Sequence, residues 1–294
     1  MEESPEVAND GVVGDESALG EALPYRERWD LSAARRFFAR SSVVTAVSRL
    51  NEQRDHDPCW QDVTFMVRGG VEGVATVMSP LMGEVVRGVV LAHGGSEDGR
   101  RFFVSEAADL ACCGAAVILP AVRVRQDSGT DEFATDVRDA VLTERAALDV
   151  LIEWAGAPRE ELSFLGHSGG GALGAILCAV EPRLSRIGIF DYGAGTLARS
   201  ARSARAREIR AGRAFAGDVA ADADWFDAAR IVGVERSARL FVQHGRSDRT
   251  VPIIEGRALF DAAAFPKLWV EYDWDHGLDA DPQARKDRAD FLST

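Results

Sequence analysis

The sequence predicts an α/β fold, with a mostly parallel sheet of eight strands covered by helices on both faces. Short apolar runs typical of buried strands alternate with longer segments typical of helices from about residue 60 onward. The chain has 294 residues, 46% of them hydrophobic, which is enough for one large domain of this kind with additions. We therefore expect the α/β domain to span residues 60–294.

Each element follows from local composition. Residues 60–68 and 71–78 flank Gly69-Gly70 and predict an antiparallel hairpin at the start of the sheet. The next two strands are short apolar runs, VVRGVVLA at 85–92 and AAVILP at 115–120. Further strands are expected at 161–165, 186–190, 238–243 and 267–272, and helices at 99–113, 134–155, 170–181, 253–264 and 282–292.

Two segments precede the α/β domain. Residues 1–23 are acidic and poor in aromatic residues, so we expect them to be disordered. Residues 24–59 form an expected helical extension, whose second helix would carry Val47 and Leu50. The extension would pack on the main domain or on a second copy, and a homodimer through these helices is one expected arrangement.

The alternation of strands and helices breaks between residues 193 and 236, where we expect a lid insertion. Between Arg199 and Arg213 there are six arginines and one acid, Glu208, a local charge of +5. Because arginine suits carboxylates and phosphates, this segment could favour an anionic substrate. The other interpretation is a solvated helix balanced by nearby acids.

Composition excludes several classes of protein. The net charge of −13 disfavours binding to nucleic acid or to anionic membranes. No apolar run is long enough for a membrane span, and no signal peptide is visible. The four cysteines lack metal-ligand spacing and are expected to be buried free thiols, as in a reducing compartment. We expect a cytoplasmic protein without a metal or cofactor.

The run GHSGG at 166–170 fits the G-x-S-x-G pattern of a nucleophile elbow. A predicted strand precedes Ser168 and a predicted helix follows it, which is the context that the pattern requires. Small residues at 166 and 170 would let strand and helix approach closely around a strained serine. The alternative is an ordinary serine in a glycine-rich turn.

An acid and a base follow Ser168 in the chain order Ser, Asp, His. Asp248 lies in HGRSDRTVP after the predicted strand 238–243, and His276 lies in DWDHG after the predicted strand 267–272. Taken alone, Asp248 could form an Asx turn and His276 could be a surface histidine. Asp191, directly after the strand 186–190, is an alternative acid.

Another glycine-rich turn, HGGS at 93–96, follows the predicted strand 85–92. The backbone amides of Gly95 and Gly169 are the expected oxyanion donors, with Ser96 as an alternative to Gly95. A simple turn between strand and helix is the other interpretation. The candidate substrate-binding residues are Ser96, His167, Arg123 and Arg125.

The motifs HGG, GHSGG, HGRSDRTVP and DHG resemble those of the α/β-hydrolase superfamily. Within it they are closest to dienelactone-hydrolase-like and prolyl-oligopeptidase-like serine hydrolases. The resemblance implies that Ser168 is the nucleophile, that His276 is the general base and acid, and that Asp248 orients it. It also implies a cofactor-free carboxylesterase that cleaves a small ester, thioester or lactone through an acyl-enzyme.

The resemblance to any subfamily is limited. The dienelactone hydrolases proper carry a cysteine nucleophile, and this chain has no propeller domain of the oligopeptidase kind. Because a fold does not fix a function, three alternatives stay open. They are a non-hydrolytic enzyme for cyclisation, isomerisation or C–C cleavage, a hydrolase of small amides or peptides, and a ligand-binding receptor that retains the triad.

Overall fold

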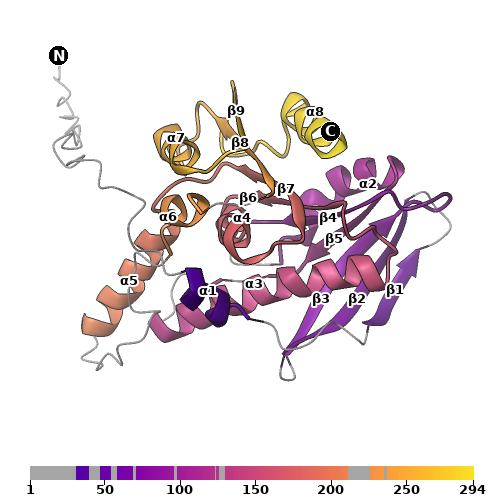
Figure 1. The fold of residues 1–294 in the computed structure, drawn as a ribbon, viewed down its shortest axis with the longest axis horizontal. Helices are drawn as coiled ribbons and strands as arrows, with labels where there is room; N and C mark the ends of the chain where they lie inside the picture. Colours follow the sequence, from indigo (N-terminus) through magenta and orange to yellow (C-terminus); the bar gives the residue numbers. More distant parts are fainter. Residues whose placement is uncertain are drawn as a thin grey trace, which may run out of the picture.

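A nine-stranded mixed sheet forms the centre of the computed structural model (Figure 1). The structure describes residues 31–39, 47–53, 58–68, 71–95, 98–122, 124–125, 130–210, 226–234 and 237–294. The strand order is β1-β2-β3-β5-β4-β6-β7-β8-β9. The expectation for residues 1–23 lies outside the described residues.

The sheet divides into an antiparallel and a parallel part. Strands β1, β2, β3 and β5 pair antiparallel in that order, whereas β5, β4, β6, β7, β8 and β9 run parallel. The predicted hairpin at the start of the sheet is confirmed as β2 and β3. The strands are β1 (Val47–Gln53), β2 (Cys59–Arg68), β3 (Val71–Ser79), β4 (Arg87–Ala92), β5 (Ala115–Pro120), β6 (Leu162–His167), β7 (Leu184–Phe190), β8 (Arg239–Gly245) and β9 (Lys267–Tyr272).

Helices cover both faces of the sheet, as the sequence predicts. One apolar core lies between the sheet and α3, α4 and α1, and the other lies under α2 and α8. In Figure 1, α2 and α8 lie at the upper right, and α1 and α3 cross the lower half. The helices are α1 (Leu31–Phe37), η2 (Arg100–Phe103), α2 (Val104–Cys112), α3 (Thr130–Glu153), α4 (Gly169–Val180), α5 (Thr196–Arg210), α6 (Ala228–Val232), α7 (Ile253–Ala262) and α8 (Pro282–Ser293).

The N-terminal extension is helical only in part, which corrects the prediction for residues 24–59. Helix α1 packs on this chain's own core through Ala34 and Phe38. Residues 47–53, however, form β1, which pairs with β2 and brings the sheet to nine strands instead of eight. The three-residue spacing of Val47 and Leu50 imitates a helix, but the free edge of β2 offers backbone partners that a local pattern cannot reveal.

Most of the expected lid region, 193–236, is helical where the structure describes it. It contains α5 and α6, and residues 211–225 lie outside the described residues. Arg199 is paired with Glu255 of α7 at 2.7 Å, so this arginine is neutralised within the chain. Whether the region acts as a lid stays a prediction.

Two sequence expectations concern the environment of the protein. Cys59 and Cys178 are buried as predicted, but Cys112 and Cys113 are exposed. They lie at the end of α2, where only the preceding Leu110 and Ala111 reach the core. Among the described residues, no helix has the length and apolarity needed to cross a membrane.

Helix α3 buries a carboxyl group without a partner. Glu144 is 0% exposed, and neither carboxyl oxygen has a hydrogen-bond partner in the structure. Its helical neighbours Val141 and Leu148 are equally buried in the apolar core. Burial therefore raises the pKa of Glu144 well above its usual value, so the folded protein holds this proton where the unfolded chain releases it.

We expect the Glu144→Leu variant to be more stable than the wild type, by a margin that grows with pH. Folding raises the pKa of Glu144. Its contribution to the free energy of unfolding is therefore intact below the unfolded pKa, near 4.5, and is lost as pH rises toward the folded pKa. In that window one group changes the free energy of unfolding by about 1.4 kcal/mol per pH unit. Urea unfolding of both proteins from pH 5 to pH 9 measures this, and a margin independent of pH would contradict it.

Candidate active site

Ser168 lies at the turn between β6 and α4, the context that the sequence predicts for a nucleophile elbow. Its backbone has φ 51° and ψ −114°, a strained conformation for a residue with a side chain. A Cβ atom on Gly166 would collide with the Gly170 carbonyl, so strand and helix need small residues here. Because α4 begins directly after Ser168, its N-terminal dipole favours negative charge beside the serine.

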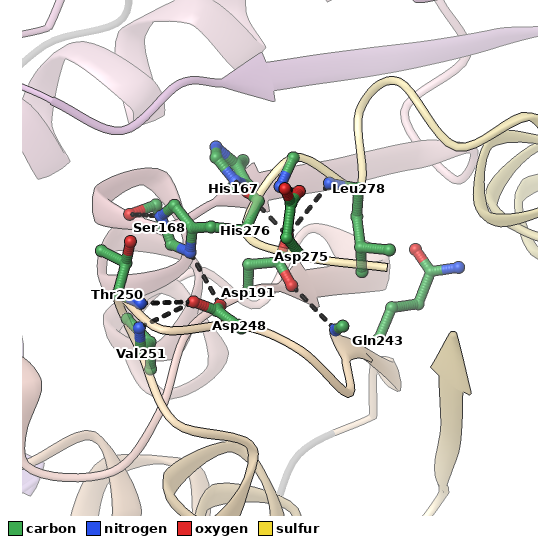
Figure 2. A network of polar contacts seen from close by, with 12 residues as sticks. His167, Ser168, Asp191, Gln243, Asp248, Thr250, Val251, Asp275, His276 and Leu278 are labelled. Carbon is green, nitrogen blue, oxygen red and sulfur yellow. Dashed lines mark hydrogen bonds and ion pairs between the residues drawn. The ribbon is translucent and has the colours of Figure 1, made fainter. Parts of the chain in front are cut away.

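A continuous chain of hydrogen bonds joins Ser168, His276 and Asp248 (Figure 2). The Ser168 hydroxyl lies 3.0 Å from His276 Nε2, and His276 Nδ1 lies 2.7 Å from Asp248 Oδ2. With the proton of the ring on Nδ1, His276 donates to the carboxylate and accepts from the serine. The structure thus brings together three residues that are separated by up to 108 positions in the chain.

The two candidate acids occupy different environments. The other oxygen of Asp248 accepts hydrogen bonds from the amides of Thr250 and Val251, at 2.8 and 2.9 Å. Asp191 is fully buried at the end of β7, and its oxygens accept from the amides of Gly245 and Leu278 (Figure 2). Asp248 therefore contacts the His276 ring, whereas Asp191 holds the backbone of two neighbouring loops.

The loop that carries His276 is anchored on both sides of the histidine. His167 Nε2 donates to the carbonyl of His276 at 2.8 Å. The backbone amide of Leu278 donates a hydrogen bond to Asp191 at 3.2 Å. The Leu278 carbonyl accepts one from Arg288 of α8 at 3.3 Å. These bonds fix the backbone of the loop and therefore the position from which the imidazole reaches Ser168.

Arg288 is the centre of a buried polar network behind this loop. It is 1% exposed, and its guanidinium binds both oxygens of Glu106 at 2.6 and 2.8 Å. It also donates to Gln243 Oε1 at 3.0 Å and lies 4.3 Å from the centre of the Phe190 ring. The network joins α2, β7, β8 and α8 under the candidate site.

We expect Arg288→Met to lower the free energy of unfolding by about 3–5 kcal/mol, because it leaves the Glu106 charge buried without its partner. The double variant Arg288→Met/Glu106→Gln should recover much of this loss, since the second change removes the orphan charge. Urea unfolding of the two single variants and the double variant completes the cycle. A loss in the double variant equal to the sum of the two single losses would show that the pair is not coupled.

Two glycine-rich turns meet at Ser168, as the oxyanion prediction requires. A Cβ atom on Gly94 would lie 2.6 Å from the Gly169 amide nitrogen, so the turn after β4 touches the start of α4. Gly95 has φ +104°, a conformation that favours glycine. Gly95, Gly169 and Ser168 line one cavity, whereas Ser96, the alternative donor, lies outside the described residues.

This cavity has a volume of about 280 Å³ and opens on the serine. Its apolar walls come from the turn after β5 and from α3, α4 and α5, and His93 lies at its edge. Burial, followed by the nearby His167 ring, lowers the pKa of His93 to about 4, so this ring is neutral at pH 7. The apolar lining residues are Val122, Val124, Phe133, Val137, Ala172, Leu173 and Leu197.

The predicted substrate-binding residues that the structure describes, His167 and Arg125, both have partners within the chain. His167 is 4% exposed and stacks on Phe102, so its ring is not open to a substrate. Its Nε2 binds the His276 carbonyl, and a substrate-binding role for His167 stays a prediction. Arg125 pairs with Asp136 at 2.9 Å, and Arg123 lies outside the described residues.

The cavity wall and the supporting network leave no recognisable signal in the local sequence. Phe133, Val137 and Leu173 belong to ordinary helical apolar patterns, and only the arrangement of α3 and α4 directs them toward Ser168. Arg288 and Glu106 are 182 residues apart, and no local pattern links them. The turns that follow the parallel strands indicate where the site lies, because ligands bind at the carboxyl ends of such strands.

Two groups of side chains among the described residues could offer three ligand atoms to a metal ion. They are His167, Asp191 and His276, and Asp191, His244 and Asp248. In the first group the His167 and Asp191 atoms already bind backbone partners, and both nitrogens of His276 are engaged by Ser168 and Asp248. The prediction of a metal-free protein stays a prediction.

Comparison with known proteins gives matches in structure and none in sequence. No family model matches the chain, and no curated protein matches it. An acetyl xylan esterase from a Thermoanaerobacterium species superposes with a TM-score of 0.69 at 15% identity, over 91% of this chain and 93% of that chain. One from a Paenibacillus species gives 0.70 at 14% identity, over 92% and 96%. A puromycin-hydrolyzing peptidase of Mycobacterium tuberculosis gives 0.60 at 16% identity, over 79% of this chain and 39% of that chain.

This chain has the α/β-hydrolase fold. At identities this low the likeness establishes the fold alone, and it agrees with the superfamily that the sequence motifs resemble. In this fold β4, β6, β8 and β9 run parallel, so the four loops that follow them meet at one edge of the sheet. Those loops carry Gly95, Ser168, Asp248 and His276, which explains why residues so distant in sequence assemble.

Proposed function

We propose that this protein is a serine hydrolase that cleaves a carboxylic ester through an acyl-enzyme. The observation that carries the proposal is the unbroken chain of hydrogen bonds from Ser168 through His276 to Asp248. A serine hydroxyl is a weak nucleophile unless an adjacent base takes its proton, and this arrangement supplies both the base and its orienting acid.

The mechanism begins when the Ser168 oxygen attacks the ester carbonyl and its proton moves to His276 Nε2. The negative charge on the carbonyl oxygen is stabilised by the backbone amides of Gly95 and Gly169 and by the N-terminus of α4. His276 then gives the proton to the alcohol oxygen as the bond from carbon to that oxygen breaks. Water attacks the resulting acyl-serine as His276 takes its proton, and His276 then gives that proton to the Ser168 oxygen as its bond to the acyl carbon breaks and the acid is released.

Asp248 acts through His276. Its carboxylate fixes the tautomer with the proton on Nδ1 and stabilises the imidazolium that forms during each half-reaction. The two amide hydrogen bonds from Thr250 and Val251 hold the carboxylate in the required orientation. The loop contacts of His167, Asp191 and Arg288 position the imidazole without touching the reacting atoms.

Two similarities support an ester over other acyl substrates. The acetyl xylan esterases superpose over more than nine tenths of this chain, and they are named for ester cleavage. Amide cleavage is the second candidate, because a puromycin-hydrolyzing peptidase has the same fold. Thioesters and lactones are compatible with the same chemistry.

Turnover of matched acyl compounds tests the proposal. The purified protein is assayed with p-nitrophenyl butyrate, butyryl thiocholine and butyryl p-nitroanilide, which share one acyl group. We expect the ester to give the highest kcat/KM and the anilide the lowest. Failure of the wild-type protein to turn over any member would contradict hydrolysis, and preference for the anilide would identify an amidase.

A further inference from the structure

Two cavities of different chemistry meet at Ser168 and His276. One is the apolar cavity described above, which contains Ser168, and the other is a polar cavity that contains His276. Thr250 lines both. Building on the proposed ester hydrolysis, we propose that the substrate is an ester of a short, neutral, apolar acid with a polar, hydroxylated alcohol.

The apolar cavity suits the acyl part because it lies beside both proposed oxyanion donors. The substrate carbonyl must sit between Ser168 and the amides of Gly95 and Gly169, and all three line this cavity. The acyl chain attached to that carbonyl then extends along Val124 and Leu197 toward α3. Burial of an apolar chain against such walls is favourable because it removes apolar surface from water.

The charge of the lining argues for a neutral acyl group. No aspartate, glutamate, lysine or arginine is among the described residues that line the cavity, and His93 is uncharged at pH 7. A carboxylate in this space would lose its hydration without gaining an ion pair. Arg125 and Arg199 were candidates for binding an anionic substrate. Arg125 forms an ion pair with Asp136, and Arg199 forms one with Glu255.

The volume of the cavity limits the length of the chain. At ~30 Å³ for each water-sized group, 280 Å³ holds about nine groups, so acyl chains of up to about eight carbons fit in it. The inner wall is closed by Phe133, Val137 and Leu173, each at most 3% exposed. Longer chains would have to displace packed core residues.

The polar cavity suits the alcohol part because His276 must deliver a proton to the departing oxygen. This cavity, of about 480 Å³, is lined by Ser247, Arg249, Thr250, Asp275 and His276. The first four are exposed, so the cavity is open to water and does not favour an apolar group. Arg249 donates and Asp275 accepts, which matches the hydroxyl groups of a polyol or sugar and leaves no net charge in need of a counter-ion.

The first experiment varies the acyl part on a constant leaving group. For the wild type we expect kcat/KM to peak between p-nitrophenyl butyrate and octanoate and to fall at least about tenfold at the myristate. The mono-p-nitrophenyl ester of succinate, which adds a carboxylate at the far end, should be at least about tenfold worse than the butyrate at low and high salt. A profile that is flat or rises to the myristate, or preference for the succinate, would overturn the acyl assignment.

The second experiment varies the alcohol on a constant butyryl group. Glycerol 1-monobutyrate and propyl butyrate have the same number of carbons in the alcohol, and each rate is divided by that of alkaline hydrolysis. We expect the glycerol ester to be preferred several-fold. A preference for the propyl ester after this correction would overturn the assignment of the polar cavity.

Matched variants locate each preference. Val124→Phe should lower kcat/KM for the octanoate about tenfold more than for the acetate, because a larger side chain at position 124 reduces the space for the longer acyl chain. Leu197→Ala should shift the optimum to longer chains, whereas Leu268→Ala, on the exposed edge strand β9, should not. Arg249→Gln should remove the glycerol preference, and Arg159→Gln, in the turn before β6 and so at the strand end away from Ser168, should retain it. If Val124→Phe leaves the acyl-chain dependence of kcat/KM unchanged and Arg249→Gln leaves the alcohol preference unchanged, the preferences do not arise from the two cavities.

Failure of the two proposals can be distinguished. Inertness of the wild type toward every ester would contradict ester hydrolysis and the substrate assignment together. Turnover that depends on Ser168 but shows none of the expected preferences would overturn the substrate assignment alone.

Discussion

Ser168→Ala should lower kcat for p-nitrophenyl butyrate by about 10⁴- to 10⁶-fold while leaving the fold intact. The change removes one hydroxyl, whose only hydrogen bond described by the structure is to His276. Alanine is strained no more than serine at φ 51°, so the elbow should persist. Steady-state kinetics and thermal unfolding of the same preparation measure both parts of the prediction.

The matched control is Ser163→Ala, which changes a buried serine on β6 that lies five residues before Ser168 and lines neither cavity. We expect it to keep kcat within a few-fold of the wild type. Wild-type turnover in purified Ser168→Ala protein would remove the nucleophile from the mechanism. Loss of activity together with unfolding would be recognised from the melting curve, and Ser168→Gly would then replace the variant.

Asp248→Asn should lower kcat by about 10⁴-fold, close to the effect of losing the base. The asparagine amide can present a donor to His276 and so favour the tautomer with its proton on Nε2, which cannot accept from Ser168. The two backbone amides that bind Asp248 Oδ1 keep an acceptor if the new side chain places its oxygen there. The fold should therefore tolerate the change.

Asp191→Asn is the matched comparison, because it alters the other candidate acid in the same way. Asp191 binds two backbone amides and no atom of the His276 ring, so we expect a loss of stability of about 1–3 kcal/mol and a loss of kcat below about tenfold. Kinetics of both variants at pH 7.5, with urea unfolding, separate the two roles. A damaging Asp191→Asn beside a silent Asp248→Asn would mean that the acid is misassigned.

Local patterns predicted those parts of the molecule that depend on neighbours in the sequence. The elbow, for instance, needs glycines around Ser168 and a helix that starts at once, and both requirements are met within 166–180. The parallel strands are continuous apolar runs because both of their faces are buried, so most of them were placed correctly. The chain order of Asp248 and His276 then followed from the turns at the ends of β8 and β9.

Features that depend on distant partners could not be predicted. Residues 47–53 became β1 because the edge of β2 is free to pair, and nothing in VSRLNEQ indicates that edge. His167 holds the carbonyl of His276 from 109 residues away, and its position in the elbow motif had suggested substrate binding instead. The arginines of α5 suggested an anionic substrate, but their effect depends on counter-ions such as Glu255, which lies 56 residues beyond Arg199.

The most direct test of the mechanism is chemical quenching during turnover of a p-nitrophenyl ester, followed by mass analysis of the peptides. We predict a burst of p-nitrophenol equal to the enzyme concentration, and a butyryl group on Ser168 that forms and decays at rates compatible with kcat. Protein carrying His276→Ala should show no such burst. Turnover without an acylated Ser168, or a butyryl group that accumulates on another residue at those rates, would contradict the account.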